Sequence, residues 1–398
     1  MILFSVASLL GGLATNSGQL IAFRALQGLA AALMSPAALS IVITTFKEGK
    51  ERNKALSVWG AVAAGGAAAG LLLGGILTQY LDWRWNLFVN VPVGILVILA
   101  SYRYIPESKA DVDHTHLDLP GAVLATSGLM ILVFTLVKAS SYGWTNSKTI
   151  GLFVLSTVLL VSFIINEKKS KHPLMPLSIF KIRNVTGANL TQLPIAAGLF
   201  AMFFFLSLYV QGVLQFSPVK TGLAFLPITI VIGITAGFAS KLVGKVGYKK
   251  IMIVAPLIIA TGLFVLSFIS VGGSYSHNVL PGLLIFASGM GFTFIAITIA
   301  ATSGVPHHEA GLASGLLNTS QQIGGSLGLA ILSSIAASRT ADFIATHPGT
   351  GNLAIVGQVA GYQSAFKVAV VFMILGSLAA LFVIKDIKTD KTIVHPVI

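Results

Sequence analysis

A single charged side chain, Arg24, lies well inside an apolar stretch of the sequence. On a helix, positions 24, 27, 28 and 35 share one side, and they hold Arg24, Gln27, Gly28 and Ser35. An arginine within a membrane costs about 2.5–3.5 kcal/mol to insert, so it is usually paired, faces a cavity or is functional. We therefore predict that this polar and small-residue face helps to bind a proton or a substrate. The alternative is that Arg24, near the end of its stretch, extends its guanidinium to the membrane surface.

Amide side chains inside two later apolar stretches could line the same kind of cavity. Two of them lie just before Pro194, which predicts a break in that helix, and the other three share one helix face. Such groups can equally form hydrogen bonds between helices, each worth roughly 0.6 kcal/mol. The candidate substrate contacts are Asn189, Gln192, Asn318, Gln321 and Gln322.

Glycines at matching positions connect two distant stretches. Gly66-x3-Gly70 in one stretch corresponds to Gly324-x3-Gly328 in the other, and each stretch follows a charged loop. Repeated halves are common in membrane transporters. Small residues at this spacing also pack ordinary membrane helices together, but their shared position in two halves of the chain favours an internal repeat.

The stretches that carry these residues have the length and composition of membrane spans. The 398 residues are 55% hydrophobic and only 9% charged, with a mean hydropathy of +0.89, whereas soluble domains are about 25% charged. Helices about 20 residues long cross a hydrocarbon core of about 30 Å, and the alternating pattern of a β-barrel is absent from the sequence. We predict an all-α integral membrane protein. The twelve predicted spans are Ile2–Ala14, Gln19–Thr45, Ala55–Leu81, Asn86–Tyr104, Leu119–Val137, Ile150–Ile165, Val185–Val210, Thr221–Val243, Ile251–Val271, Val279–Val305, Ala310–Ala337 and Val368–Ile384.

The basic residues indicate how the chain crosses the membrane. Of the 25 Lys and Arg, eighteen fall in loops on one side, six on the other, and Arg24 lies in a span. By the positive-inside rule the first side is cytoplasmic, and both termini lie there. A net charge of +13 spread over short loops argues against a nucleic-acid partner. The sequence has no cysteine, no metal-binding histidine spacing and no phosphate-binding loop, so we predict no metal, no cofactor and no enzymatic activity.

Several motifs resemble those of one transporter family. Residues 22–32 read AFRALQGLAAA, similar to an RxxQGxgaA segment. Residues 70–75 read GLLLGG, similar to the antiporter signature GPxxGG, and residues 83–94 read WRWNLFVNVPVG, close to WRWxFxxNxPxG. Residues 311–325 resemble a late helix of the same family. The chain thus resembles the major facilitator superfamily, in particular its fourteen-span drug/proton antiporter branch.

This resemblance implies an organisation and a function. Residues 1–104 would be four helices of an N-terminal bundle, residues 105–184 two linker spans and a cytoplasmic connection, and residues 185–398 a C-terminal six-helix bundle. Such proteins export small amphipathic drug-like molecules in exchange for protons, by alternating access. The resemblance implies a monomer in the plasma membrane that contacts lipid, protons and a small-molecule substrate. It assigns Arg24 to proton coupling with an acid on the first helix, and Gly66, Gly70, Gly74 and Gly75 to the antiporter motif.

The sequence also departs from the family pattern. Leu71 replaces the motif proline, although packing by Gly70, Gly74 and Gly75 should remain. Met1 corresponds to a position inside the family's third helix, and Ile2–Ala14 is short for a span, so we expect twelve of fourteen helices. We also expect the chain by itself not to perform coupled transport. The alternative is a non-transporting membrane protein or an inactive exporter remnant.

Overall fold

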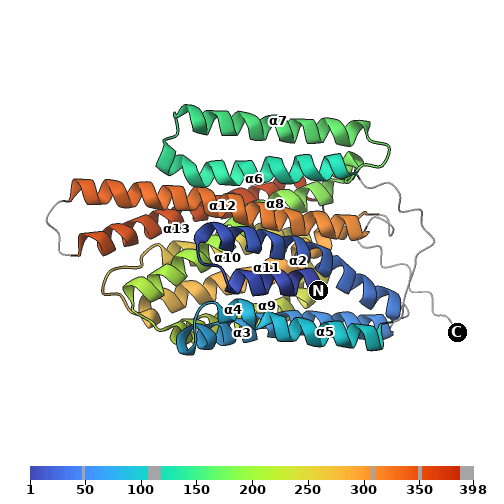
Figure 1. The fold of residues 1–398 in the computed structure, drawn as a ribbon, viewed down its shortest axis with the longest axis horizontal. Coiled ribbons are helices and arrows are strands. Elements are labelled where there is room, and N and C mark those ends of the chain that lie inside the picture. The colour runs from blue at the N-terminus through green and yellow to red at the C-terminus, as the bar shows by residue number, and fades with distance from the viewer. Residues whose placement is uncertain (47–49, 106–117, 306–309, 348–351, 386–398) are drawn as a thin grey trace. The chain divides into compact units, whose positions relative to one another are not determined.

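The computed structural model describes residues 1–46, 50–105, 118–305, 310–347 and 352–385. Almost all of these residues are helical, and the described part of the chain contains no strand, which confirms the predicted fold class (Figure 1). The helices are α1 (Ile2–Gly12), α2 (Ser17–Thr45), α3 (Lys50–Tyr80), α4 (Trp85–Phe88), α5 (Asn90–Tyr104), α6 (Leu119–Tyr142), α7 (Ser147–Lys169), α8 (Arg183–Leu208), α9 (Pro218–Val246), α10 (Tyr248–Leu266), α11 (Leu280–Thr302), α12 (Ala310–Thr346) and α13 (Leu353–Val383).

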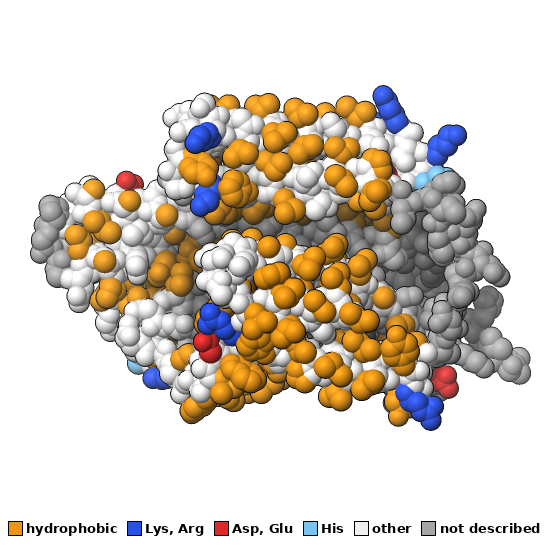
Figure 2. All heavy atoms as spheres, in the orientation of Figure 1, with side chains coloured by type: hydrophobic (Ala, Val, Ile, Leu, Met, Phe, Trp, Pro, Cys, Tyr) orange, Lys and Arg blue, Asp and Glu red, His pale blue; other side chains and the backbone are white. Residues whose placement is uncertain are grey.

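Every predicted span overlaps at least one of these helices. Among the described residues, nine helical segments are long and apolar enough to cross a membrane, and the first of them combines α4 and α5. The predicted spans that coincide with α1, α2 and α3 are not among the nine. Helix α1 has only 11 residues, as the short first stretch predicts. On the face shown in Figure 2, hydrophobic side chains cover the sides of the helices and charged side chains lie near the helix ends, as expected for a protein surrounded by lipid.

The chain forms two compact units. Unit 1 comprises Met1–Asp113 and Gln215–Thr229, and unit 2 comprises His114–Leu214 and Ile230–Ile398. In unit 1, α1 packs against α2, α4 and α5. In unit 2, α8 packs against α12 and α13, α10 packs against α11 and α13, and α6 packs against α7 and α12. The three-part division expected from the resemblance stays a prediction.

Small residues bring the helices of unit 2 into close contact. A Cβ atom on Gly289 of α11 would lie 2.6 Å from the Ile259 side chain of α10, and one on Gly262 of α10 would lie 2.5 Å from the Phe286 backbone nitrogen of α11. Lipid tails are as apolar as leucine, so close packing rather than water exclusion must hold membrane helices together. The glycines therefore position the helices of this unit.

Two predictions about helix ends and breaks are wrong. The sequence predicts an outer loop over Arg339–Lys367, but α12 continues to Thr346 and α13 already begins at Leu353. Hydropathy detects only the apolar part of a helix, whereas the polar end of α12 remains helical, with Thr340 and Thr346 donating hydrogen bonds to carbonyls one turn earlier. The start of α13 is instead largely apolar and belongs to a helix that is long and apolar enough to cross a membrane. The predicted break at Pro194 is also absent, because α8 runs unbroken from Arg183 to Leu208. Neighbouring helices in a membrane protein often compensate for the hydrogen bond that a proline removes.

Candidate functional site

Arg24 lies at the start of a hydrogen-bonded chain that connects α2 to α1. Its Nη1 donates to Gln27 Oε1, and Gln27 Nε2 donates to the hydroxyl of Ser8 on α1. Gln27 is buried with only 4% of its surface exposed, whereas Arg24 is exposed. The buried amide therefore holds one edge of the guanidinium, while the rest of the guanidinium can approach a partner. This arrangement agrees with the shared helix face that the sequence indicates, and it adds Ser8.

The other two members of the predicted stripe contribute less to this cluster. Gly28 is exposed, and a Cβ atom there would meet no described atom within 4 Å. Ser35 lies on α2, but its side chain is outside the described part of the structure. Ser5, one turn before Ser8 on α1, is buried and its hydroxyl has no hydrogen-bond partner among the described residues. The hydroxyls of Ser5 and Ser8 thus place further polar groups within the short first helix.

The described residues offer Arg24 no carboxylate. The ion pair found in this part of the chain joins Arg84 to Asp82 at 3.2 Å, beside the start of α4. All twelve acids of the sequence lie in loops or at the ends of predicted spans. No group of three or more His, Asp or Glu side chains that could hold a metal ion occurs among the described residues. The arrangement can therefore stabilise an anion at Arg24, but the described residues do not include the acid that the resemblance implies.

The glycines of the antiporter motif divide into two groups. A Cβ atom on Gly75 of α3 would lie 2.6 Å from the carbonyl oxygen of Pro218 at the start of α9, and one on Gly222 of α9 would lie 2.6 Å from the carbonyl oxygen of Leu71. The Gln79 side chain also accepts a hydrogen bond from the Val219 backbone at 3.1 Å. These backbones approach so closely within unit 1 that only glycine fits without displacement at Gly75 and Gly222.

Gly66 and Gly70 do not take part in this contact. A Cβ atom at either position would meet no described atom within 4 Å, whereas one on Gly74 would lie 3.3 Å from the Asn86 side chain. The packing role expected for Gly70 therefore stays a prediction. Spacing alone cannot distinguish these positions, because it does not specify which turn of α3 meets α9.

The corresponding glycines of α12 pack tightly. Cβ atoms on Gly324 and Gly328 would overlap Leu193 and Ala197 of α8, and one on Gly325 would lie 2.7 Å from the Phe200 ring. These glycines therefore form a helix contact within unit 2. Within the described part of the chain, the Gly66 and Gly70 pair shows no such contact, so the two pairs differ there despite their equal spacing.

Asn189, one of the candidate substrate contacts, is engaged within the protein. Its amide nitrogen donates to the Val185 carbonyl at 2.8 Å, and its oxygen accepts a hydrogen bond from Ser320 of α12 at 2.7 Å. Both side chains are buried. The sequence left substrate binding and interhelical bonding as alternatives, and the observed geometry favours bonding between α8 and α12. Nothing in the sequence singled out Ser320 as the partner.

This hydrogen bond leads to a testable stability difference. Ser320→Ala should lower the free energy of unfolding by roughly 0.6–1.7 kcal/mol, because Asn189 loses its donor in a buried setting. Unfolding of the detergent-solubilised chain by increasing SDS, followed by circular dichroism, measures the change. Ser314→Ala, at an exposed position of the same helix, is the matched control. Equal effects of the two substitutions would contradict the assignment.

The remaining amide candidates lie nearby but differ in exposure. Gln192 of α8 is buried at 8% exposure, and Gln321 of α12 is partly buried. Asn318 and Gln322 are exposed on α12. Among the described residues, these four side chains form no hydrogen bond, so their polar groups remain the better candidates for contacts with a ligand.

Together, the long helices and their apolar outer surfaces define a polytopic α-helical membrane protein. The chain belongs to the Major Facilitator Superfamily, whose family model matches residues 1–329. Members of this family are transporters and not enzymes, in agreement with the sequence analysis.

Several similar proteins are named for antibiotic resistance, antibiotic export or multidrug transport. The chain is 38% identical over 390 residues to the puromycin resistance protein of Streptomyces alboniger, covering 97% of this chain and 77% of that protein. It is 36% identical over 342 residues to a cephamycin export protein of Amycolatopsis lactamdurans, covering 85% and 70%. A multidrug transporter protein of Bacillus subtilis is 30% identical over 345 residues, covering 86% and 63%.

Solved structures support the same fold. A bacterial homologue of the human lysosomal transporter Spinster, in an inward-facing and unoccupied conformation, matches with a TM-score of 0.59 at 14% identity, covering 96% of this chain and 81% of that one. A peptide transporter matches with a TM-score of 0.58 at 15% identity, covering 96% and 79%. At these identities the likeness establishes the fold alone.

Proposed function

We propose that this protein exports small amphipathic drug-like molecules across the cell membrane by alternating access, driven by the inward movement of protons. The observation that carries the proposal is the exposed Arg24 held by the buried Gln27, in a chain whose relatives include antibiotic resistance and export proteins. A cation fixed inside the membrane stabilises the charged form of a nearby carboxylate. It thereby lowers the pKa of that carboxylate and sets the pH at which the carboxylate binds a proton. The amides Gln192, Asn318, Gln321 and Gln322 of unit 2 are proposed to contact substrate.

A second function has one observation in its favour. The described residues place no acid beside Arg24, and this favours a membrane protein that binds small molecules without coupled transport. Binding and transport therefore have to be measured separately. Puromycin is a suitable probe because one relative is named for resistance to it.

The test uses inverted membrane vesicles that contain the chain. Export in cells corresponds to uptake into these vesicles, so an imposed pH gradient should drive puromycin accumulation above that of empty vesicles, and an uncoupler should abolish it. Puromycin binding to the purified chain without accumulation would favour the binding-only function. Neither binding nor accumulation of puromycin or ethidium would contradict the proposal.

Substitutions of Arg24 test whether this residue takes part in proton coupling. In vesicles that accumulate the probe, Arg24→Ala should lower the proton-driven rate about tenfold or more, because removing a group that stabilises charge commonly costs a factor of this size. Arg24→Lys keeps the charge but loses the planar donor fork that Gln27 holds, so it should restore only part of the rate. Lys148→Ala, which removes a charge at the start of α7, is the control. If Arg24→Lys is fully active, the arginine only reaches for the membrane surface.

Because all acids lie in loops or at the ends of predicted spans, we predict that the protein binds substrates of low charge more tightly than dications. A dication in a low-dielectric cavity generally needs a carboxylate to offset its lost hydration. Neutral, zwitterionic or singly charged amphiphiles should therefore bind at least about tenfold more tightly than bis-quaternary compounds. Competition of ethidium and a bis-quaternary amine against puromycin measures this difference. Tighter binding of the bis-quaternary compound would refute the predicted preference.

The proposed orientation places both termini in the cytoplasm. The chain has no cysteine, so single cysteines can report on each side. A membrane-impermeant thiol reagent should label Thr145→Cys in intact cells and leave Ser170→Cys unlabelled until the cells are opened. In intact cells, the labelling rate of Thr145→Cys should exceed that of Ser170→Cys by at least about tenfold, because the basic loop after α7 is retained on the cytoplasmic side. The reverse labelling pattern would invert the proposed topology.

A further inference from the structure

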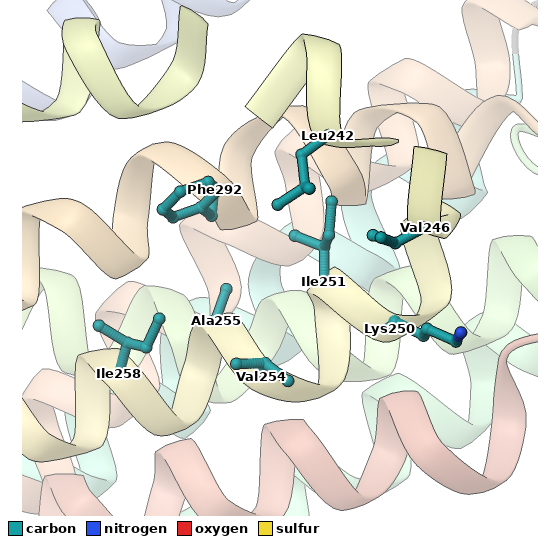
Figure 3. Close-up of a pocket in the computed structure, with 8 residues that line it drawn as sticks. All are labelled: Leu242, Val246, Lys250, Ile251, Val254, Ala255, Ile258 and Phe292. Atoms are coloured by element: carbon teal, nitrogen blue, oxygen red, sulfur yellow. The ribbon is translucent and has the colours of Figure 1, made fainter. Parts of the chain in front are cut away.

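An apolar groove lies where α9, α10 and α11 meet in unit 2. Its volume is about 270 Å³, and it is lined by Leu242, Val246, Lys250, Ile251, Val254, Ala255, Ile258 and Phe292. Figure 3 shows side chains from the end of α9 and the first turns of α10 around this space, with Phe292 of α11 closing one side. Seven of the eight lining residues are wholly hydrophobic, so the groove offers hydrocarbon and almost no hydrogen-bonding groups.

The groove is elongated along α10. Lys250, Val254 and Ile258 follow one another at four-residue spacing, and eight residues of α-helix extend about 12 Å. Val254 in the middle is 53% exposed, so the groove opens onto the outer surface of the unit. Lys250 lies at one end, with its ammonium group directed away from the apolar side chains, and Ile258 lies toward the other. An occupant therefore has a charged end near Lys250 and an apolar body along α10.

Positive charge is concentrated at the lysine end. The last turns of α9 carry Lys241 and Lys245, and the first turn of α10 carries Lys249 and Lys250. Gly247 joins the two helices with a φ of 83°, a conformation that side chains other than glycine rarely adopt, and this tight turn keeps the lysines in one region. The sequences of α9, α10 and α11, the three helices that line the groove, contain no Asp or Glu. The charge thus selects an anionic head group.

We propose that this groove binds one anionic phospholipid of the surrounding membrane, with an acyl chain along α10 and its phosphate near Lys250. A phospholipid has the required polarity along its length, and it reaches the groove from the bilayer without crossing water. Basic residues near a membrane surface attract anionic lipid by about 1 kcal/mol each, which gives the head group a clear preference over a neutral one. The site is separate from Arg24 and does not depend on the proposed transport.

The experiment measures lipid binding to the full chain in detergent by native mass spectrometry. Dioleoyl phosphatidylglycerol should bind with one preferred site and more tightly than dioleoyl phosphatidylcholine. Lys250→Gln should lower the phosphatidylglycerol affinity about fivefold and leave phosphatidylcholine unchanged. Val254→Trp fills the groove and should lower binding of both lipids about fivefold or more. The matched controls are Lys148→Gln and Leu155→Trp, at a basic and an exposed apolar position of α7.

Two further measurements keep the proposal open to refutation. A phosphatidylglycerol analogue with a photoreactive acyl chain should label peptides of α9, α10 or α11, and labelling confined to other helices would overturn the assignment. Glycerol 3-phosphate at equal concentration should not displace the lipid, because it has no chain for the groove. Full displacement by this soluble phosphate, or equal binding of the two lipids with no effect of Lys250→Gln, would also overturn it. Size-exclusion profiles verify that each variant is folded.

Discussion

Gly324→Ala is expected to lower the free energy of unfolding of the chain by about 2 kcal/mol, the middle of the range for overpacked sites. The added methyl group would overlap the Leu193 carbonyl of α8, and a backbone atom cannot move aside as a flexible side chain can. The helices would have to separate, and the neighbouring contacts of Gly325 and Gly328 would loosen with them. SDS-induced unfolding of the detergent-solubilised chain, followed by circular dichroism, measures the effect.

Gly315→Ala is the matched control for this prediction. It lies on the same helix and adds the same methyl group, but a Cβ atom there would meet no described atom within 4 Å. Alanine also favours helix over glycine, so this variant should be as stable as the unsubstituted chain or more stable. If both alanines destabilise equally, glycine serves this helix through backbone flexibility and not through its contact with α8.

The sequence predicts the helices well because lipid imposes a simple rule. Backbone groups inside a membrane must be paired within the segment, so each sufficiently long apolar stretch becomes a helix. Helix ends follow different physics, because they reach water and polar residues can continue the helix there. Thr346 illustrates this limit: it lies outside the predicted span, yet its hydroxyl bonds to the Asp342 carbonyl in the last turn of α12.

The candidate site could be predicted in part. Helical spacing correctly placed Gln27 beside Arg24, since both residues lie on one helix. It could not identify Ser8 or Ser320, because spacing reveals the face of a residue but not the residue on the opposite helix. The sequence predicts that Asn189 is a candidate substrate contact, but its side chain instead accepts a hydrogen bond from Ser320. Ser320 is 131 positions away in the sequence, so spacing along one helix could not reveal this bond. The assignments to proton coupling and substrate contact stay predictions.

Gly75→Ala is expected to disrupt the contact between α3 and the start of α9, whereas Gly70→Ala is expected to leave it intact. Both glycines belong to one motif and both changes add one methyl group, but only the methyl on Gly75 meets backbone, at 2.6 Å from the Pro218 carbonyl oxygen. Overpacking of about 1–3 kcal/mol should lower the fraction of molecules in close contact about fivefold or more. Cysteines at Gln79 and Val219, positions linked by a hydrogen bond, allow the contact to be measured with a short bifunctional thiol reagent.

The same cysteine pair is placed in the unsubstituted, Gly70→Ala and Gly75→Ala backgrounds, so the loss of the Gln79 hydrogen bond is common to all three. Cross-linking should be about fivefold slower or more with Gly75→Ala and unchanged with Gly70→Ala. Puromycin accumulation in inverted vesicles should follow the same order if the contact is needed for transport. Equal cross-linking in all three backgrounds would show that this helix pair tolerates the methyl group. Reduced cross-linking in both variants would instead show that the motif acts through flexibility of α3, since a methyl group on Gly70 meets no atom of the described residues within 4 Å.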